Sequence, residues 1–85
     1  MYTVYILISE KNHRLYVGCT SDFSKRLERH NKGFVIATKH NIPYSMLYSE
    51  EFTDKATAFQ RERYLKSLWS ARFKNKLKRD FLNKK

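Results

Sequence analysis

Residues 2–19 read YTVYILISEKNHRLYVGC and consist of two apolar segments separated by a short polar stretch. The first segment, Met1 to Ser9, is rich in β-branched and aromatic residues and has a continuous apolar centre, which is typical of a strand covered on both faces. Residues 11–13 predict a hairpin turn, after which residues 15–19 resume the strand pattern. With an even-numbered loop, Tyr5 and Tyr16 would point to the same face of an antiparallel pair.

A helix and a third strand are expected next. Ser21 or Asp22 can cap a helix that ends near Gly33, and residues 34–43 lack a period and predict a loop. Residues 44–52 alternate well enough for a strand, in which Tyr44 and Tyr48 would share one face.

Two more helices complete the expected fold. Asp54 can cap a helix whose ridge carries Ala58, Glu62, Leu65 and Trp69 at spacings of four, three and four. A third helix is expected from residue 70, with an apolar ridge and an otherwise basic surface. The length and the order of elements predict a single α/β (α+β) domain over residues 1–85.

Charge favours a polyanionic partner. Eighteen Lys and Arg against eight acidic residues give a net charge of +10, which attracts phosphates, so nucleic acid is the leading partner. The basic residues are spread over several segments, and no apolar run approaches the roughly 20 residues that span a bilayer, so no membrane role is expected. The lone Cys19 and the lack of a leader favour the reducing cytoplasm. The sequence does not define the oligomeric state, and we expect a monomer.

Several side chains could carry chemistry. Glu62 falls in the middle of an apolar helical face, where a carboxylate is costly unless a cation compensates it. The cation could be a divalent metal, or a basic side chain such as Arg26 in an ordinary ion pair. Arg26 and His30 are four residues apart and stack on one helical ridge beside the apolar stripe. The two tyrosines could equally be structural strand residues, and His30 a surface or capping histidine.

These residues resemble a known family in their order along the chain. Thr3-Val4-Tyr5 and Tyr16-Val17-Gly18 resemble the two half-motifs of the GIY-YIG nuclease superfamily, with Thr3 in place of the first glycine. The resemblance runs from about residue 1 to residue 81 and is closest to the small single-domain bacterial members. Its further matches are Thr20, Arg26-x-x-x-His30-Asn31, Thr38, Pro43, Arg61-Glu62 and Leu65-Lys66.

The resemblance implies a GIY-YIG-like fold with a three-stranded antiparallel sheet flanked by helices. It also implies a role for each of five residues. Glu62 would hold one divalent ion, Mg²⁺ or Mn²⁺, and Tyr16 would deprotonate the attacking water. Tyr5 would assist or position that water, and Arg26 would neutralise charge on the scissile phosphate. His30 would occupy the site of a supporting proton-transfer group.

The function expected from the resemblance is metal-dependent hydrolysis of phosphodiester bonds in DNA rather than RNA, in DNA repair or processing. The nucleic acid would be contacted by basic residues on several elements: Arg26, Lys39, Arg72, Lys74 and Lys76. Two alternatives stay open at this point: a nucleic-acid-binding module without catalysis, and a domain that binds an acidic protein.

Overall fold

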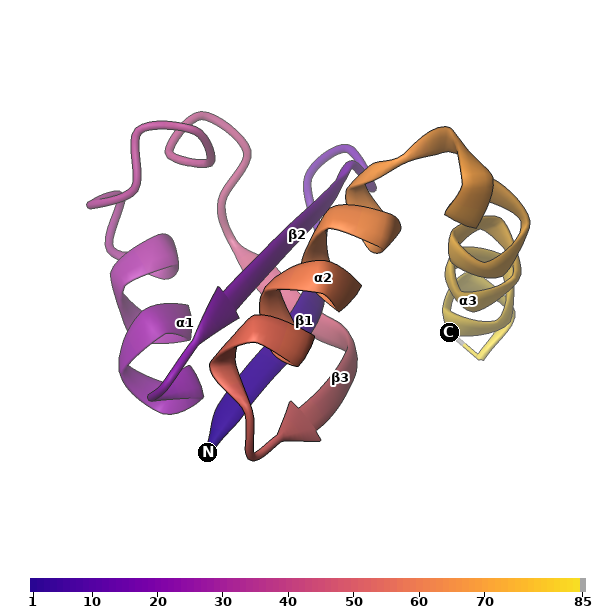
Figure 1. The fold of residues 1–85 in the computed structure, drawn as a ribbon. Helices are drawn as coiled ribbons and strands as arrows, with labels where there is room; N and C mark the ends of the chain where they lie inside the picture. The colour runs from indigo at the N-terminus through magenta and orange to yellow at the C-terminus, as the bar shows by residue number, and fades with distance from the viewer. Residues whose placement is uncertain (85) are drawn as a thin grey trace.

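The computed structural model describes residues 1–84, and its centre is an antiparallel sheet of three strands in the order β2-β1-β3. The strands are β1 (Tyr2–Ser9), β2 (Leu15–Thr20) and β3 (Tyr44–Phe52). The helices are α1 (Phe23–Asn31), α2 (Lys55–Lys66) and α3 (Ala71–Asn83), with a short 3₁₀ turn, η1 (Leu68–Ser70), before α3. The expected three-stranded antiparallel sheet with flanking helices, an α+β fold, is therefore confirmed (Figure 1).

Each face of the sheet is covered by a different helix, because the side chains of a strand alternate between faces. Val4 and Ile6 of β1 pack with Ala58 and Leu65 of α2, on what we call the α2 face. Tyr5, Leu7 and Tyr44 form a second cluster, against which Phe23 and Leu27 of α1 pack, on what we call the α1 face. Figure 1 shows α1 and α2 in separate layers, with β2 passing between them in that view.

The two expected N-caps are confirmed. The Asp22 side chain accepts a hydrogen bond from the backbone N–H of Lys25, and the Asp54 side chain accepts one from that of Thr57. Such caps satisfy amide donors that have no partner inside the helix.

The end of α1 is also specified locally. Gly33 has a φ of 80°, a conformation that glycine adopts at little cost. Its N–H bonds to the carbonyl of His30, and the N–H of Phe34 bonds to that of Arg29, which is the pairing of a Schellman motif. Asn31 then ties the helix end to β3, because its side chain both accepts from the N–H and donates to the carbonyl of Tyr44.

Two expectations about packing are wrong: that Tyr44 and Tyr48 share one face of the sheet, and that Trp69 lies on the apolar ridge of the second helix. A shift in the β1–β3 register occurs between Ile6 and Leu7, whose partners are Tyr48 and Met46. The extra residue, Leu47, reverses the alternation, so Tyr44 lies on the α1 face and Tyr48 on the α2 face.

Trp69 is not on the buried ridge of the second helix. α2 ends at Lys66, because Ser67 adopts an extended conformation with a ψ of 164°. Trp69 therefore lies in η1, where it is 87% exposed.

Candidate active site

Two phenols lie together on the α1 face, as the hairpin parity predicts. Tyr5 pairs with Gly18 and Leu7 pairs with Tyr16, so the two tyrosines are diagonal neighbours with ring centroids 6.5 Å apart. Tyr5 is on the central strand and only 1% exposed, whereas Tyr16 is on the edge strand β2 and half-buried. Tyr16 is therefore the phenol that solvent or a ligand can reach.

Gly18 makes room for the Tyr5 ring. A Cβ atom at Gly18 would lie 2.3 Å from the Tyr5 hydroxyl oxygen, closer than any non-bonded contact allows. Glycine is required here by close approach, and the Tyr-Val-Gly sequence of residues 16–18 thus has a structural reason in the packing of the other phenol.

The ridge of α1 brings Arg26 and His30 onto this pair. Arg26 Nε donates to the Tyr5 hydroxyl at 3.4 Å, and His30 Nε2 lies 3.2 Å from the same oxygen. The His30 ring also meets the edge of Tyr16, with centroids 4.9 Å apart. Four of the five expected site residues are therefore in mutual contact.

The hydrogen bonds of this cluster have a definite direction. The Thr38 hydroxyl donates to the carbonyl of Val35 and lies 2.8 Å from His30 Nδ1. With its one proton donated to Val35, this hydroxyl is placed to accept from Nδ1–H, and in that tautomer Nε2 of the neutral imidazole accepts from the Tyr5 hydroxyl. The chain of donors thus runs from Arg26 through Tyr5 and His30 to Thr38.

Burial keeps the inner members of this chain in one protonation state. His30 is 0% exposed, and burial, followed by the charge of Arg26, lowers its pKa from 6.5 to about 4. Burial also raises the pKa of Tyr5, against the opposing effect of Arg26. The pKa of Arg26 is raised, first by its hydrogen bond to Tyr5 and more weakly by Tyr16. At neutral pH the cluster therefore presents a guanidinium, protonated Tyr5 and an uncharged imidazole.

This geometry favours a positioning role for His30 over the proton-transfer role that the resemblance implies. Both ring nitrogens are engaged by Tyr5 and Thr38, and the side chain has no access to solvent. A group that exchanges protons with substrate or water needs such access. The same argument favours a positioning role for Tyr5, because its hydroxyl is enclosed between Arg26 and His30.

Glu62 lies on α2, the helix that covers the face of the sheet opposite the two tyrosines. Its helix packs on the α2 face, its side chain is 21% exposed, and its carboxylate is paired with Lys66 at 3.2 Å. The basic partner considered from the sequence is thus Lys66 and not Arg26. The charge of Glu62 nevertheless contributes to the raised pKa values of Tyr5 and of Cys19, in both cases after burial. Within residues 1–84, no hydrogen bond or ion pair joins Glu62 to the tyrosines, Arg26 or His30.

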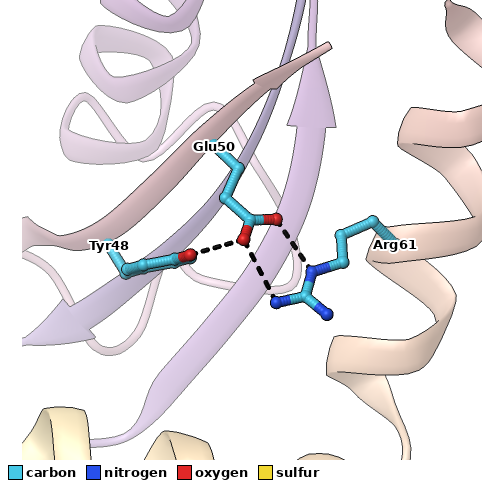
Figure 2. A network of polar contacts seen from close by, with 3 residues as sticks. All are labelled: Tyr48, Glu50 and Arg61. Carbon is cyan, nitrogen blue, oxygen red and sulfur yellow. Dashed lines mark hydrogen bonds and ion pairs between the residues drawn. The ribbon is translucent and has the colours of Figure 1, made fainter.

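A polar network sets the rotation of α2 (Figure 2). Arg61 donates to both carboxylate oxygens of Glu50 on β3, at 2.8 and 3.1 Å, and the Tyr48 hydroxyl donates to the same carboxylate. A two-point contact of this kind fixes orientation as well as distance. Since Arg61 is held toward β3, the next residue along the helix, Glu62, is turned away from it, toward β2 and Cys19.

The other expected nucleic-acid contacts are dispersed. Lys39 lies exposed in the loop before β3, and Arg72 is exposed on α3. Lys74 is half-buried and donates to the carbonyl of Ser67 at 3.4 Å, whereas Lys76 is paired with an acid of its own helix at 3.2 Å.

Two kinds of feature are absent from residues 1–84. No helix there is long and apolar enough to cross a membrane. No group of three or more His, Cys, Asp or Glu side chains in the same range could hold a metal ion. Any metal on these residues would therefore depend on oxygen ligands from substrate and water.

Comparison with known proteins identifies the fold. A family model described as the GIY-YIG catalytic domain matches residues 1–78. The chain belongs to the GIY-YIG family. This confirms the resemblance seen in the sequence and places this GIY-YIG domain in a superfamily of nucleases, of the endonuclease type, whose substrates are nucleic acids.

Bacterial relatives carry the same similarity. A UPF0213 protein of Clostridium perfringens is 39% identical over 69 residues, which cover 80% of this chain and 73% of that protein. The UPF0213 protein YazA of Bacillus subtilis is 34% identical over 65 residues, covering 75% and 66%. A UPF0213 protein of Streptococcus pyogenes serotype M1 is 42% identical over 53 residues, covering 61% and 58%. No solved structure gives a significant match to the chain.

Two features of the site escaped the sequence pattern. Thr38 was noted only as a motif match, since nothing in a loop without a period indicates that it meets a histidine eight residues earlier. Lys66 could have been found as the partner of Glu62, because a Glu followed four residues later by Lys is a common helical ion pair.

Proposed function

We propose that this GIY-YIG domain hydrolyses phosphodiester bonds of DNA with the help of Mg²⁺ or Mn²⁺, in DNA repair or processing in the cytoplasm. The observation that carries the proposal is the position of Arg26, a permanently charged group held between a buried and an accessible phenol on one face of the sheet. Within residues 1–84, no ion pair joins Arg26 to an acidic side chain, so its charge is not neutralised there.

Arg26 is the group suited to the phosphate. In phosphodiester hydrolysis the phosphoryl oxygens gain negative charge on the way to the transition state, and a fixed cation stabilises that state more than the ground state. The hydrogen bond from Arg26 to Tyr5 orients the guanidinium, and His30 and Thr38 fix the Tyr5 hydroxyl in turn. These buried hydrogen bonds thus orient Arg26, and within residues 1–84 no ion pair neutralises its charge.

Tyr16 is the group suited to activate water. It is half-buried on the edge strand, and its ring contacts His30 within the same cluster. General-base action by a phenol requires a positive charge close by, and the permanent positive charge beside Tyr16 is that of Arg26. We assign Tyr16 the general base role, and Tyr5 and His30 positioning roles.

Glu62 fits a hard divalent ion. It is a half-buried carboxylate facing β2, and Mg²⁺ commonly binds proteins through one or two carboxylates while phosphate and water complete its shell. Bound there, the ion would supply Lewis-acid stabilisation of charge on the phosphate oxygens. The Lys66 ammonium contacts Oε2 of this carboxylate at 3.2 Å, so a metal ion at Glu62 would compete with this ion pair.

The same ion pair favours a second candidate, a nucleic-acid-binding module without catalysis. If Lys66 remains on Glu62 when DNA is bound, the basic and aromatic surface would hold a strand without cutting it.

One experiment separates the two candidates. Purified protein is incubated with single-stranded, duplex and branched DNA and RNA, each with Mg²⁺, Mn²⁺ or EDTA. We expect metal-dependent cleavage that Glu62→Gln and Tyr16→Phe abolish while binding is retained. Metal-independent cleavage, or equal cleavage by the Glu62→Gln/Tyr16→Phe double variant, would reject this site. Salt-sensitive binding with no cleavage on any substrate would support the second candidate.

A further inference from the structure

A groove of about 490 Å³ lies next to Tyr16. Its walls come from β2, from Lys66 at the end of α2, and from the first two turns of α3, including Lys74, Asn75 and Lys78. Leu15 and Val17 also line it, and because they alternate with Tyr16 they face the other side of the sheet. The groove therefore lies along the free edge of β2, between that strand and α3, and Tyr16 is one of the residues that line it.

The groove is strongly basic. Three lysines line it, and none of the described residues in its walls is acidic. Lys74 and Lys78 are half-buried and four residues apart, so their side chains lie on one ridge of α3. Lys76, between them in sequence, is outside the groove and is paired with Asp80 at 3.2 Å. Among residues 1–84, Lys76 is thus paired with an acid of its own helix, whereas no ion pair joins Lys74 or Lys78 to an acidic side chain.

The spacing of these lysines fits a polymer. At a rise of about 1.5 Å per residue, Lys74 and Lys78 are about 6 Å apart along the helix axis, so their ammonium groups can reach different phosphates of one strand, whose charges repeat about every 3.4 Å along the duplex axis. Asn75 adds a side chain that can both donate and accept beside them. Because Tyr16 is one of the residues that line the groove, a strand bound in the groove would pass close to Tyr16.

We propose that this groove binds the sugar–phosphate backbone of a DNA strand on one side of the bond to be cut, with Lys74 and Lys78 each contacting a phosphate. The position of the bond at Tyr16 rests on the proposed function, whereas binding in the groove does not need cleavage. Lys66 lines the groove and also pairs with Glu62, so a phosphate in the groove offers Lys66 a second anion in place of the carboxylate.

The test compares two double variants that remove equal charge from the same helix. Lys74→Gln/Lys78→Gln changes the groove, and the matched control Arg79→Gln/Lys84→Gln changes exposed basic residues outside it, near the end of α3 and at its C-cap. Binding of fluorescein-labelled DNA is followed by anisotropy from low to moderate KCl. Each lost phosphate contact should lower the slope of log K against log salt by about 0.9 and weaken binding about eightfold near 0.1 M salt. The groove variant should thus lose about 60-fold, and the control less than half of that change in slope.

Three results would overturn the proposal. They are no binding of DNA by the wild type, an equal loss in both double variants, and a groove variant that binds like the wild type. Circular dichroism and melting of each variant exclude a folding defect as the cause of a loss.

Cleavage in the same variants separates this proposal from the proposed function. If the wild type cuts DNA and the groove variant cuts at the normal rate once saturated, the groove is a binding site of the nuclease. If the wild type does not cut but binding still depends on Lys74 and Lys78, the groove is supported as a binding site and the proposed catalytic function is rejected. If the groove variant still cuts DNA and binding does not depend on either lysine, the proposed catalytic function is supported and the groove is rejected as a binding site.

Discussion

Acidification from about pH 7.5 to about pH 5 should destabilise the protein through His30. The side chain is fully buried, and its pKa in the fold is lowered from 6.5 to about 4, by burial first and then by Arg26. Between these two pH values His30 binds a proton in the unfolded chain but not in the folded one. The stabilising effect of keeping His30 neutral is therefore complete above about pH 6.5 and is lost progressively as the pH falls toward 4.

The magnitude follows from the two pKa values. One pKa unit corresponds to about 1.4 kcal/mol, so the whole shift represents about 3 kcal/mol. At about pH 5 the unfolded histidine is mostly protonated and the folded one mostly neutral, and about 2 kcal/mol of unfolding free energy should have been lost. Glu50 and Asp54, whose pKa values are lowered in the fold, remain ionised in this window and add their losses at lower pH.

Urea unfolding at several pH values measures this loss. Circular dichroism is the better probe, because Trp69 is 87% exposed and a weak reporter of packing. The His30→Gln variant removes the titrating group, so its unfolding free energy should vary much less between pH 5 and 7.5. The matched control is His40→Gln, at an exposed loop position, which should keep the wild-type pH dependence. Equal pH dependence in wild type and His30→Gln would refute the reasoning.

Three further predictions follow from close contacts around the site. Gly18→Ala should cost about 1–3 kcal/mol in urea unfolding, since its methyl group would overlap the Tyr5 hydroxyl and force the ring to move; a variant as stable as wild type would contradict this packing. Thr38→Val leaves His30 Nδ1 without an acceptor and should cost about 1–3 kcal/mol, whereas Thr38→Ser keeps the acceptor and should cost clearly less; equal losses would show that the hydroxyl does not matter. A double-mutant cycle with Glu50→Gln and Arg61→Gln should give a coupling of about 1 kcal/mol, and additive effects would argue against the two-point contact.

Local signals in the sequence were sufficient for most of the fold. Asp22 and Asp54 cap their helices and Gly33 ends α1, because each of these positions depends on backbone groups within a few residues. The shared face of Tyr5 and Tyr16 follows from the parity of one hairpin, which is also a local property.

The features that could not be predicted depend on contacts between distant segments. The register shift at Leu47 and the end of α2 before Trp69 are decided by how β3 and η1 pack, and neither leaves a clear mark in the periodicity. Similarly, the apolar spacing around Glu62 predicted a half-buried carboxylate without showing that its helix covers the face opposite the phenols. Placing Glu62 required the anchor of Arg61 on β3, a contact between residues eleven apart in sequence.

The single-turnover cleavage rate, measured with protein in excess over DNA and with Mg²⁺ present, tests the proposed site most directly. Wild type and Glu62→Gln should bind the DNA with similar affinity, and only the wild type should cut it. Tyr16→Phe should lose cutting in the same way, because it removes the accessible phenol and leaves Tyr5 in place. A rate that is unchanged in both variants would show that the cluster around Arg26 and the carboxylate of Glu62 do not form one catalytic site.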